Sequence, residues 1–199
     1  SSPDREMMPY LTHDGSTMYY LRETAAGSGR SSFYAPAQAK KVWRLCSSRR
    51  RDTVFTSGTV MPPPFNQFDS EGSVTLTADG RQLYYSVMRQ TTGGYANVDI
   101  YQSHRMPDGR WSDVESVGGM VNGERSWESQ PSVTPDGQWL YFASNRKGGY
   151  GGTDIWRCRR NADGTWGRPE NLGAAVNTPF NEKCPFIHAD GKTDRKSVV

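Results

Sequence analysis

Acidic residues recur at regular places along this chain and offer the first possibility of chemistry. A glutamate precedes each of four similar segments and an aspartate follows in two of them; in chain order these are Glu6, Glu71, Asp99, Glu128, Asp154 and Glu182. Arg89 and Arg146 stand between the acids of the second and third segments. A ring of carboxylates could bind a cation or a saccharide, and two carboxylates about 5–9 Å apart could hydrolyse a glycoside. Alternatively, the acids cap loop N–H groups and pair with the arginines, once per segment, as a structural network.

Aromatic residues accompany these acids. Trp127, Tyr150 and Phe180 could stack on sugars or peptide side chains, or they could cover the joints between repeats. The sequence therefore predicts one binding surface, made of Glu71, Arg89, Asp99, Trp127, Glu128, Arg146, Tyr150, Asp154, Asn177, Phe180 and Glu182.

Motifs of known catalytic and cofactor sites are absent from the sequence. There is no G-x-S-x-G nucleophile elbow, and the glycine-rich stretch 148–152 matches neither of the phosphate-binding glycine motifs. His13, His104 and His188 fall at unlike places and lack the spacing of metal ligands. We therefore expect no enzyme activity, no catalytic residue, no bound metal and no cofactor.

Asp-Gly pairs recur along the chain and mark its structural units. The aspartates of the pairs, Asp14, Asp79, Asp136 and Asp190, are spaced by 65, 57 and 54 residues (79 − 14, 136 − 79 and 190 − 136). An apolar residue stands three positions before each aspartate, and an apolar and aromatic run follows the first three. A recurring period of this length indicates a repeat architecture.

One complete repeat predicts four short strands. Segment 130–134 alternates and leads into the hairpin signal Asp136-Gly137, and segment 139–143 is almost entirely apolar. Segment 154–158 supplies a third strand, and Asp163-Gly164 turns it into a fourth. Four antiparallel strands form one blade of a β-propeller, which is stable only when neighbours cover its faces. The residues expected to make those contacts include Leu140, Phe142, Ile155 and Trp156.

Alternate connections of a four-stranded meander lie at the same end. The hairpins at Asp136 and Asp163 therefore share one end of the blade, and the glycine-rich loop 145–152 shares the other with the connections between repeats. Binding residues concentrate on longer loops carried by a rigid scaffold. The candidate surface is therefore assigned to this second, loop-rich end.

The predicted fold class is all-β, a partial β-propeller of four-stranded antiparallel blades, with about three blades plus the start of another. The expected units are a degenerate first blade at 1–65, a second blade at 66–125, a third at 126–180 and the first strand of a further blade at 181–193. In the first blade, segment 41–45 is expected to stand where 154–158 stands in the third.

The last residues break the repeat. Where an apolar residue and an aromatic belong, the chain has Asp194 and Arg195, so residues 194–199 are expected to be a non-native tail that cannot form a second strand. The chain looks like a fragment open at both ends. Exposed strand edges would then favour self-association or marginal stability.

Bulk composition fits many short strands and turns. The 199 residues are 34% hydrophobic and 12% aromatic, with Gly 21 and Pro 12. A net charge of +3 gives no reason to expect nucleic-acid binding, and Arg49-Arg50-Arg51 is interpreted as part of a solvated loop. No apolar run approaches the ~18 residues of a membrane span. Three cysteines favour free, partly buried thiols, and a bridge between Cys158 and Cys184 stays open as an alternative.

Segment 131–146 resembles the TolB-type, WD40-like propeller repeat of bacterial envelope proteins. The resemblance continues through 148–156, 169–173 and 176–182, is close from about Glu71 to Gly191 and is weak before that. Val74 stands where the other repeats have Pro9, Pro131 and Pro185.

The resemblance implies a cellular location and a binding function. Similar proteins are periplasmic or outer-membrane-associated, and they often precede a peptidoglycan-binding OmpA-type domain. It implies a non-catalytic binding module that contacts an envelope protein or a peptidoglycan-associated partner through the loop-rich end. Two alternatives remain, a propeller-type glycoside hydrolase and the gating propeller of a serine peptidase.

Overall fold

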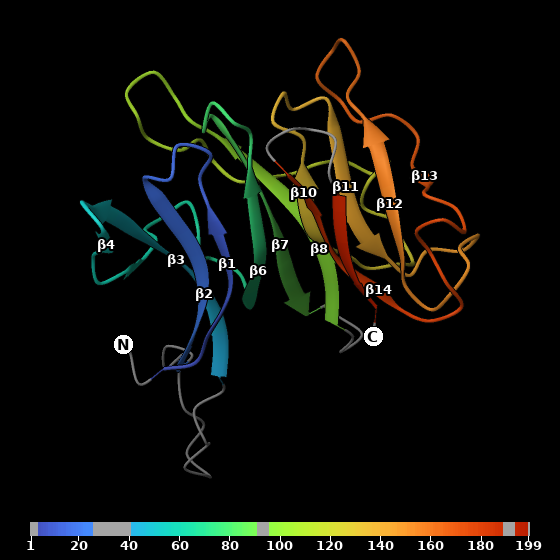
Figure 1. The fold of residues 1–199 in the computed structure, drawn as a ribbon, viewed down its shortest axis with the longest axis horizontal. Helices are drawn as coiled ribbons and strands as arrows, with labels where there is room; N and C mark the ends of the chain where they lie inside the picture. The colour runs from blue at the N-terminus through green and yellow to red at the C-terminus, as the bar shows by residue number, and fades with distance from the viewer. Residues whose placement is uncertain (1–3, 26–40, 91–95, 189–193, 199) are drawn as a thin grey trace.

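The computed structural model describes residues 4–25, 41–90, 96–188 and 194–198, and these form strands and connecting loops without a helix. Four antiparallel sheets follow one another along the chain and lie side by side (Figure 1). The predicted all-β, partial β-propeller fold is confirmed. The fourth Asp-Gly pair, at Asp190, lies outside the described residues. Over the described ranges, no helix is long and apolar enough to cross a membrane.

Each sheet is one blade, numbered in chain order. Blade 1 contains β1 (Glu6–Leu11), β2 (Thr17–Ala25), β3 (Lys41–Arg51), β4 (Val54–Phe55) and β5 (Thr59–Val60). Blade 2 contains β6 (Ser70–Leu76), β7 (Gln82–Gln90), β8 (Ala96–His104) and β9 (Glu115–Ser116). Blade 3 contains β10 (Glu128–Val133), β11 (Trp139–Ser144), β12 (Asp154–Arg159) and β13 (Glu170–Asn171). The two strands of blade 4 are β14 (Glu182–Ile187) and β15 (Asp194–Val198).

Blades 1 and 4 confirm one expectation from the sequence and correct two others. Segment 41–45 is indeed the third strand of blade 1, because it opens β3. The prediction of a solvated loop at Arg49, Arg50 and Arg51 is wrong, since β3 runs through all three. The prediction that residues 194–199 cannot pair is also wrong, because β15 pairs with β14 in antiparallel register. Backbone hydrogen bonds hold such a strand whatever its side chains are.

Asp-Gly turns join the first two strands of blades 1 to 3. In blade 3 the Thr134 hydroxyl donates to the Asp136 carboxylate at 2.6 Å, and the carboxylate also accepts the Gln138 N–H at 3.0 Å. Gly137 has φ +70°, which favours glycine. These hydrogen bonds to the charged form lower the pKa of Asp136. Threonine and aspartate form the same pair in the other two turns, at Thr12 with Asp14 and Thr77 with Asp79.

A bulge interrupts the first strand of every blade. The register shifts after Met7 in β1, after Glu71 in β6, after Ser129 in β10 and after Lys183 in β14. The residue before the proline has a positive φ in three of them, Met8, Gln130 and Cys184. Proline has no N–H to give to a ladder, so a bulge is where a strand tolerates it.

Hydroxyl groups join the first strands of neighbouring blades. Four positions before its turn aspartate, blades 1 to 3 have Tyr10, Thr75 and Ser132. The Tyr10 hydroxyl donates to the Leu76 carbonyl of blade 2 at 2.8 Å. The Thr75 hydroxyl accepts the Val133 N–H of blade 3 at 3.3 Å, and Ser132 accepts the Ile187 N–H of blade 4 at 3.0 Å. Each blade therefore holds the next at one repeated position.

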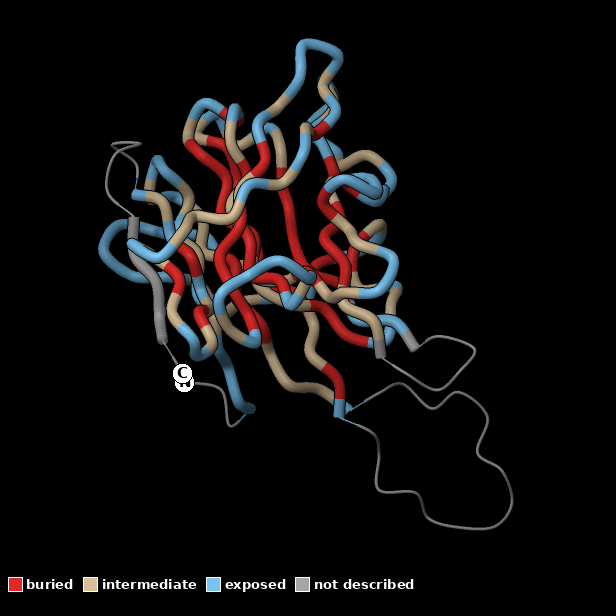
Figure 2. Tube along the Cα trace, turned by 90° about the vertical axis from the view of Figure 1, so that its right-hand side faces the viewer, coloured by how far each residue is buried: buried red, intermediate tan, exposed pale blue. Residues whose placement is uncertain are grey.

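The hydrophobic core lies between the blades, where buried stretches of adjacent sheets face each other (Figure 2). One cluster joins blades 1 and 2, and a second joins blades 2 and 3. Leu140, Phe142, Ile155 and Trp156, predicted as interface residues, are all buried. Burying one such side chain contributes about 1.5–3 kcal/mol, so stacking rather than any single blade stabilises the fold.

Candidate functional site

The loop rim is the end of the blades formed by loops 118–127, 145–153 and 172–181, at the bottom of Figure 1. Its best-defined group is Glu128, whose side chain is fully buried. The carboxylate accepts hydrogen bonds from the Gly123 N–H at 2.8 Å, the Ser126 hydroxyl at 2.8 Å and the Ser144 hydroxyl at 2.7 Å. The guanidinium of Arg146 completes the set at 2.9 Å. The Glu128 carboxylate therefore holds the loops on both sides of β10 and β11 together.

Arg146 connects blade 2 to blade 3. Its guanidinium lies over the rings of Phe142 and Trp156, at 5.0 Å and 5.4 Å from their centroids, and donates to the carbonyl of Val121. A partly buried guanidinium that stacks and donates in several directions is well suited to such a joint. Arg146 therefore contributes to structure more directly than to ligand contact.

Blade 2 uses a different arginine. Glu71 is paired at 2.9 Å with Arg44 of blade 1, and burial raises the pKa of Glu71 although Arg44 pulls it down. Arg89 pairs instead with Asp99 at 3.2 Å. Burial also raises the pKa of Asp99, against the opposing effect of Arg89. Glu71 and Glu128 therefore each pair with one arginine, but the partner of Glu71 comes from the neighbouring blade.

Asp154 holds the glycine-rich loop of blade 3. Its carboxylate accepts the N–H groups of Tyr150 at 2.5 Å and Gly151 at 3.0 Å, and the Asn171 amide at 2.8 Å. A Cβ on Gly149 would lie 2.0 Å from the Asp154 carboxylate. The loop can wrap the aspartate only because glycine occupies that position.

Asn177 completes the third strand of blade 3. Its side-chain oxygen accepts the Ile155 N–H at 2.8 Å, and its amide donates to the Ile155 carbonyl at 3.0 Å. Asn122 makes the same pair with Ile100 in blade 2, and Asn66 makes it with Leu45 in blade 1. Asn66 was missed from sequence, although it precedes Glu71 by the same five positions (71 − 66 and 182 − 177) that separate Asn177 from Glu182.

Glu182 begins the first strand of blade 4 and is fully buried. Its carboxylate accepts the Thr178 N–H at 3.0 Å and the Thr178 hydroxyl at 2.5 Å, while its own N–H donates to the Thr153 carbonyl at 2.8 Å. The carboxylates of Glu71, Asp99, Glu128, Asp154 and Glu182 are thus buried at one end of the blades, where neighbouring backbone and side-chain groups donate hydrogen bonds to them.

The loop rim exposes three large apolar side chains beside the charged side chains of Glu124, Arg125 and Lys147. Tyr150 is 54% exposed, Phe180 is 66% exposed and Met120 is 58% exposed. The Gly152 N–H donates to the Phe180 carbonyl at 3.1 Å, which holds the Tyr150 and Phe180 loops together. Trp127 is only partly exposed. Met120 was missed from sequence because a single methionine in a turn carries no repeat signal.

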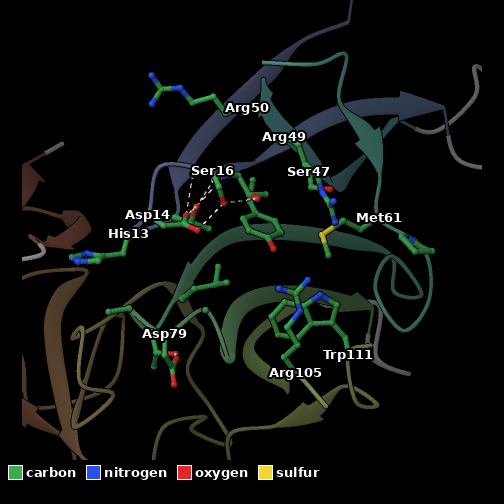
Figure 3. Close-up of a pocket in the computed structure, with 18 residues that line it drawn as sticks. His13, Asp14, Ser16, Ser47, Arg49, Arg50, Met61, Asp79, Arg105 and Trp111 are labelled. Atoms are coloured by element: carbon green, nitrogen blue, oxygen red, sulfur yellow. Dashed lines mark hydrogen bonds between the residues drawn. The ribbon is translucent and has the colours of Figure 1, made fainter. Parts of the chain in front are cut away.

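The opposite end of the blades, the hairpin rim, carries a groove that the sequence did not predict. This rim is formed by the turns at Asp14, Asp79, Asp108, Asp136 and Asp163. The groove encloses about 520 Å³ between blades 1 and 2, and Figure 3 shows the residues that line it. None of the predicted site residues lines this groove.

Comparison with solved structures supports the propeller fold. The chain is similar to TolB from Acinetobacter baumannii, with 18% identity and a TM-score of 0.54 over 98% of this chain and 38% of that one. It is similar to a Mycobacterium tuberculosis puromycin-hydrolyzing peptidase, with 14% identity and a TM-score of 0.54 over 90% of this chain and 24% of that one. An α-L-arabinofuranosidase from Lactobacillus brevis gives 14% identity and a TM-score of 0.53 over 97% and 64% respectively.

These similarities define a class, an array of β-propeller blades, and at such identities they show the fold alone. The chain spans less than two thirds of the length of each of these structures. No protein-family model matches the sequence. No curated protein matches it either.

Proposed function

We propose that this chain is a non-catalytic binding module of the bacterial cell envelope that holds a partner protein through its loop rim. The observation that carries the proposal is the pairing of exposed apolar side chains with a rigid support beneath them. Met120, Tyr150 and Phe180 project from loops whose backbone is fixed by Glu128, Asp154 and Glu182. Exposed aromatic residues on a preorganised frame are typical of protein-binding surfaces.

The geometry of the acids supports binding over hydrolysis. A glycoside hydrolase needs two carboxylates roughly 5–9 Å apart that face the sugar. Glu71, Glu128 and Asp154 instead accept hydrogen bonds from loop groups and guanidinium groups that surround them. These bonds occupy the oxygens that an acid and a nucleophile would have to present to a substrate.

The exposed side chains of the loop rim favour a protein partner over a glycan. The exposed side chains of this rim include one methionine and two aromatic rings beside the charged side chains of Glu124, Arg125 and Lys147, and apolar anchors with a charged periphery are typical of protein–protein interfaces. The envelope location rests on the resemblance of segment 131–146 to TolB-type repeats, and the similarity to the Acinetobacter baumannii structure supports it at the level of fold.

A pull-down with matched variants tests this proposal. The immobilised chain is offered solubilised envelope proteins and, separately, purified peptidoglycan, and the same is done with the double variant Tyr150→Ala/Phe180→Ala. Val54→Ala is the control, because Val54 is 65% exposed but lies on β4 of blade 1. We expect the double variant to keep its melting temperature and lose a protein that wild type and control retain. Equal retention by all three forms, capture of peptidoglycan alone, or release of cleaved glycan would overturn the proposal.

A further inference from the structure

The groove on the hairpin rim is built from two blades and takes no part in the function proposed above. Blade 1 supplies the turn at Asp14 and the end of β3, and blade 2 supplies the turn at Asp79 together with Arg105 and Trp111. Figure 3 shows Arg49 on the blade 1 side and Arg105 beside Trp111 on the other. A volume of about 520 Å³ lies within the range of small-molecule sites, roughly 300–1,000 Å³.

Strand register places polar groups on the wall of the groove. Tyr19 of β2 pairs with Ser47 of β3, and Thr17 pairs with Arg49. Residues two apart in a strand share a face, so these four side chains lie on the same side of blade 1. All four line the groove.

The two guanidinium groups have donors to offer. Arg49 and Arg105 are both exposed, and the Arg49 guanidinium forms no hydrogen bond or ion pair with any described residue. Arg105 lies over the Trp111 ring at 5.3 Å and uses only its Nε, which donates to the Gly109 carbonyl at 3.3 Å. The outer nitrogens of both side chains are therefore available to an anion.

Tyr19 adds a hydroxyl donor to the lining of the groove. The residue is only 5% exposed, and its hydroxyl has no hydrogen-bond partner within the described part of the chain. Burial raises the pKa of Tyr19, and the positive charges of Arg105 and Arg49 oppose that rise. The hydroxyl is therefore free to donate a hydrogen bond to a ligand oxygen in the groove.

The charge balance selects the type of anion. Asp14 and Asp79 also line the groove, and both accept hydrogen bonds from their own turns. Arg49, Arg50 and Arg105 exceed them by one positive charge. Figure 3 shows Arg50 extending away from the other labelled residues, and without it the two remaining arginines balance the two aspartates, so in neither case does the lining carry two excess positive charges. A single negative charge is therefore better matched than the double charge of phosphate.

The apolar part of the lining favours an organic ligand. Met61, Leu76 and Trp111 give the carbon skeleton of an acid a surface that an inorganic ion cannot use. We propose that this groove binds the carboxylate of a small organic acid, with Arg49 and Arg105 donating to the carboxylate oxygens and the Tyr19 hydroxyl adding a third donor. An arginine fork matches a carboxylate in two parallel hydrogen bonds, which is the basis of the assignment.

Isothermal titration of the whole chain tests the proposal with benzoate, propionate, the blocked peptide N-acetyl-glutamate amide, and inorganic phosphate. We expect saturable binding of carboxylates and weaker binding of phosphate. Arg49→Gln and Arg105→Gln should each weaken carboxylate binding by about tenfold or more, and Tyr19→Phe by about threefold. Arg125→Gln removes the same charge from the loop rim and is the matched control. The peptide and the free acids distinguish a side-chain carboxylate from a free one as the source.

Several results would overturn the assignment. These are no binding of any carboxylate, tighter binding of phosphate, or equal affinities for the Arg49, Arg105 and Arg125 variants. If a glutamine variant does not fold, Arg49→Lys keeps the charge without the fork and should bind between wild type and Arg105→Gln; wild-type affinity in that variant also contradicts the proposal. The outcome is independent of the loop rim, because Tyr150→Ala/Phe180→Ala should leave carboxylate binding unchanged.

Discussion

The carboxylate of Glu71 in blade 2 lies 2.9 Å from the guanidinium of Arg44 in blade 1. The Glu71 side chain is fully buried, and Arg44 also donates to the Phe68 carbonyl at 2.8 Å. The pair therefore crosses the joint between two blades, so its loss affects how the blades hold together and not only one loop.

Arg44→Met should destabilise the chain strongly, because it leaves a buried carboxylate without its counter-charge. We expect a loss of about 3–5 kcal/mol in the free energy of unfolding, measured by urea denaturation. The added change Glu71→Gln should recover part of the loss. Arg110→Met is the control. Its ion pair with Asp108 is exposed, so its loss should leave the free energy of unfolding unchanged. An unchanged midpoint in Arg44→Met would show that the pair does not join the blades.

Asn177→Ala should destabilise blade 3, because it leaves both the N–H and the carbonyl of Ile155 without their partner. A loss of about 2 kcal/mol or more is expected, since buried unpaired groups cost roughly 1–3 kcal/mol each. Asn161→Ala removes an exposed asparagine from a turn and serves as the comparison. Equal unfolding midpoints for the two variants would contradict the role given to Asn177.

Gly151→Ala should displace the glycine-rich loop. Its Cβ would lie 1.9 Å from the Phe180 carbonyl oxygen and 2.6 Å from that of Thr178, both of which are backbone atoms. Hydrogen exchange of the Gly152 N–H should therefore accelerate, and partner binding through Tyr150 should weaken. Gly119→Ala meets nothing within 4 Å and should leave both readouts unchanged.

The turn aspartates make the free energy of unfolding depend on pH in the acidic range. The pKa of Asp136 is lowered from 3.8, first by the Thr134 hydroxyl and then by the Gln138 N–H. Because the folded-state pKa lies below that of the unfolded chain, this contribution is complete above about pH 4 and is lost as the pH falls through the folded value. Asp136→Asn should flatten the pH dependence of unfolding over that window. A wild-type slope in the variant would show that Asp136 does not contribute.

Thiol labelling separates the three cysteines, which are all free thiols in the structure. Burial raises the pKa of Cys46 to about 11 and that of Cys158 to about 12, whereas Cys184 is exposed. Since the thiolate is the reactive form, iodoacetamide should modify Cys184 in the folded chain and reach the other two only in urea. Mass spectrometry gives the count. A Cys184 that reacts only after reduction would instead support the bridge to Cys158.

The sequence predicted what depends on local periodicity. Asp136 and the equivalent turn aspartates predict hairpins, because turn chemistry is local. The apolar run that contains Leu140 and Phe142 predicts a buried strand. The pairing of Arg44 with Glu71 could not be predicted, since it depends on the register of β3 against β2 and on how two blades meet. The groove beside Trp111 escaped prediction for a similar reason, because it belongs to the joint between blades rather than to either repeat.

The hydroxyl ties at Tyr10, Thr75 and Ser132 bear on how such a chain grows. Each blade carries the side-chain hydroxyl on one face and the backbone group that pairs with it on the other. Tandem copies of such a blade can therefore stack through the same hydrogen bond. Gene duplication could therefore lengthen the array while the older joints stay as they are, and the ring size of a complete propeller becomes a matter of copy number rather than of new design.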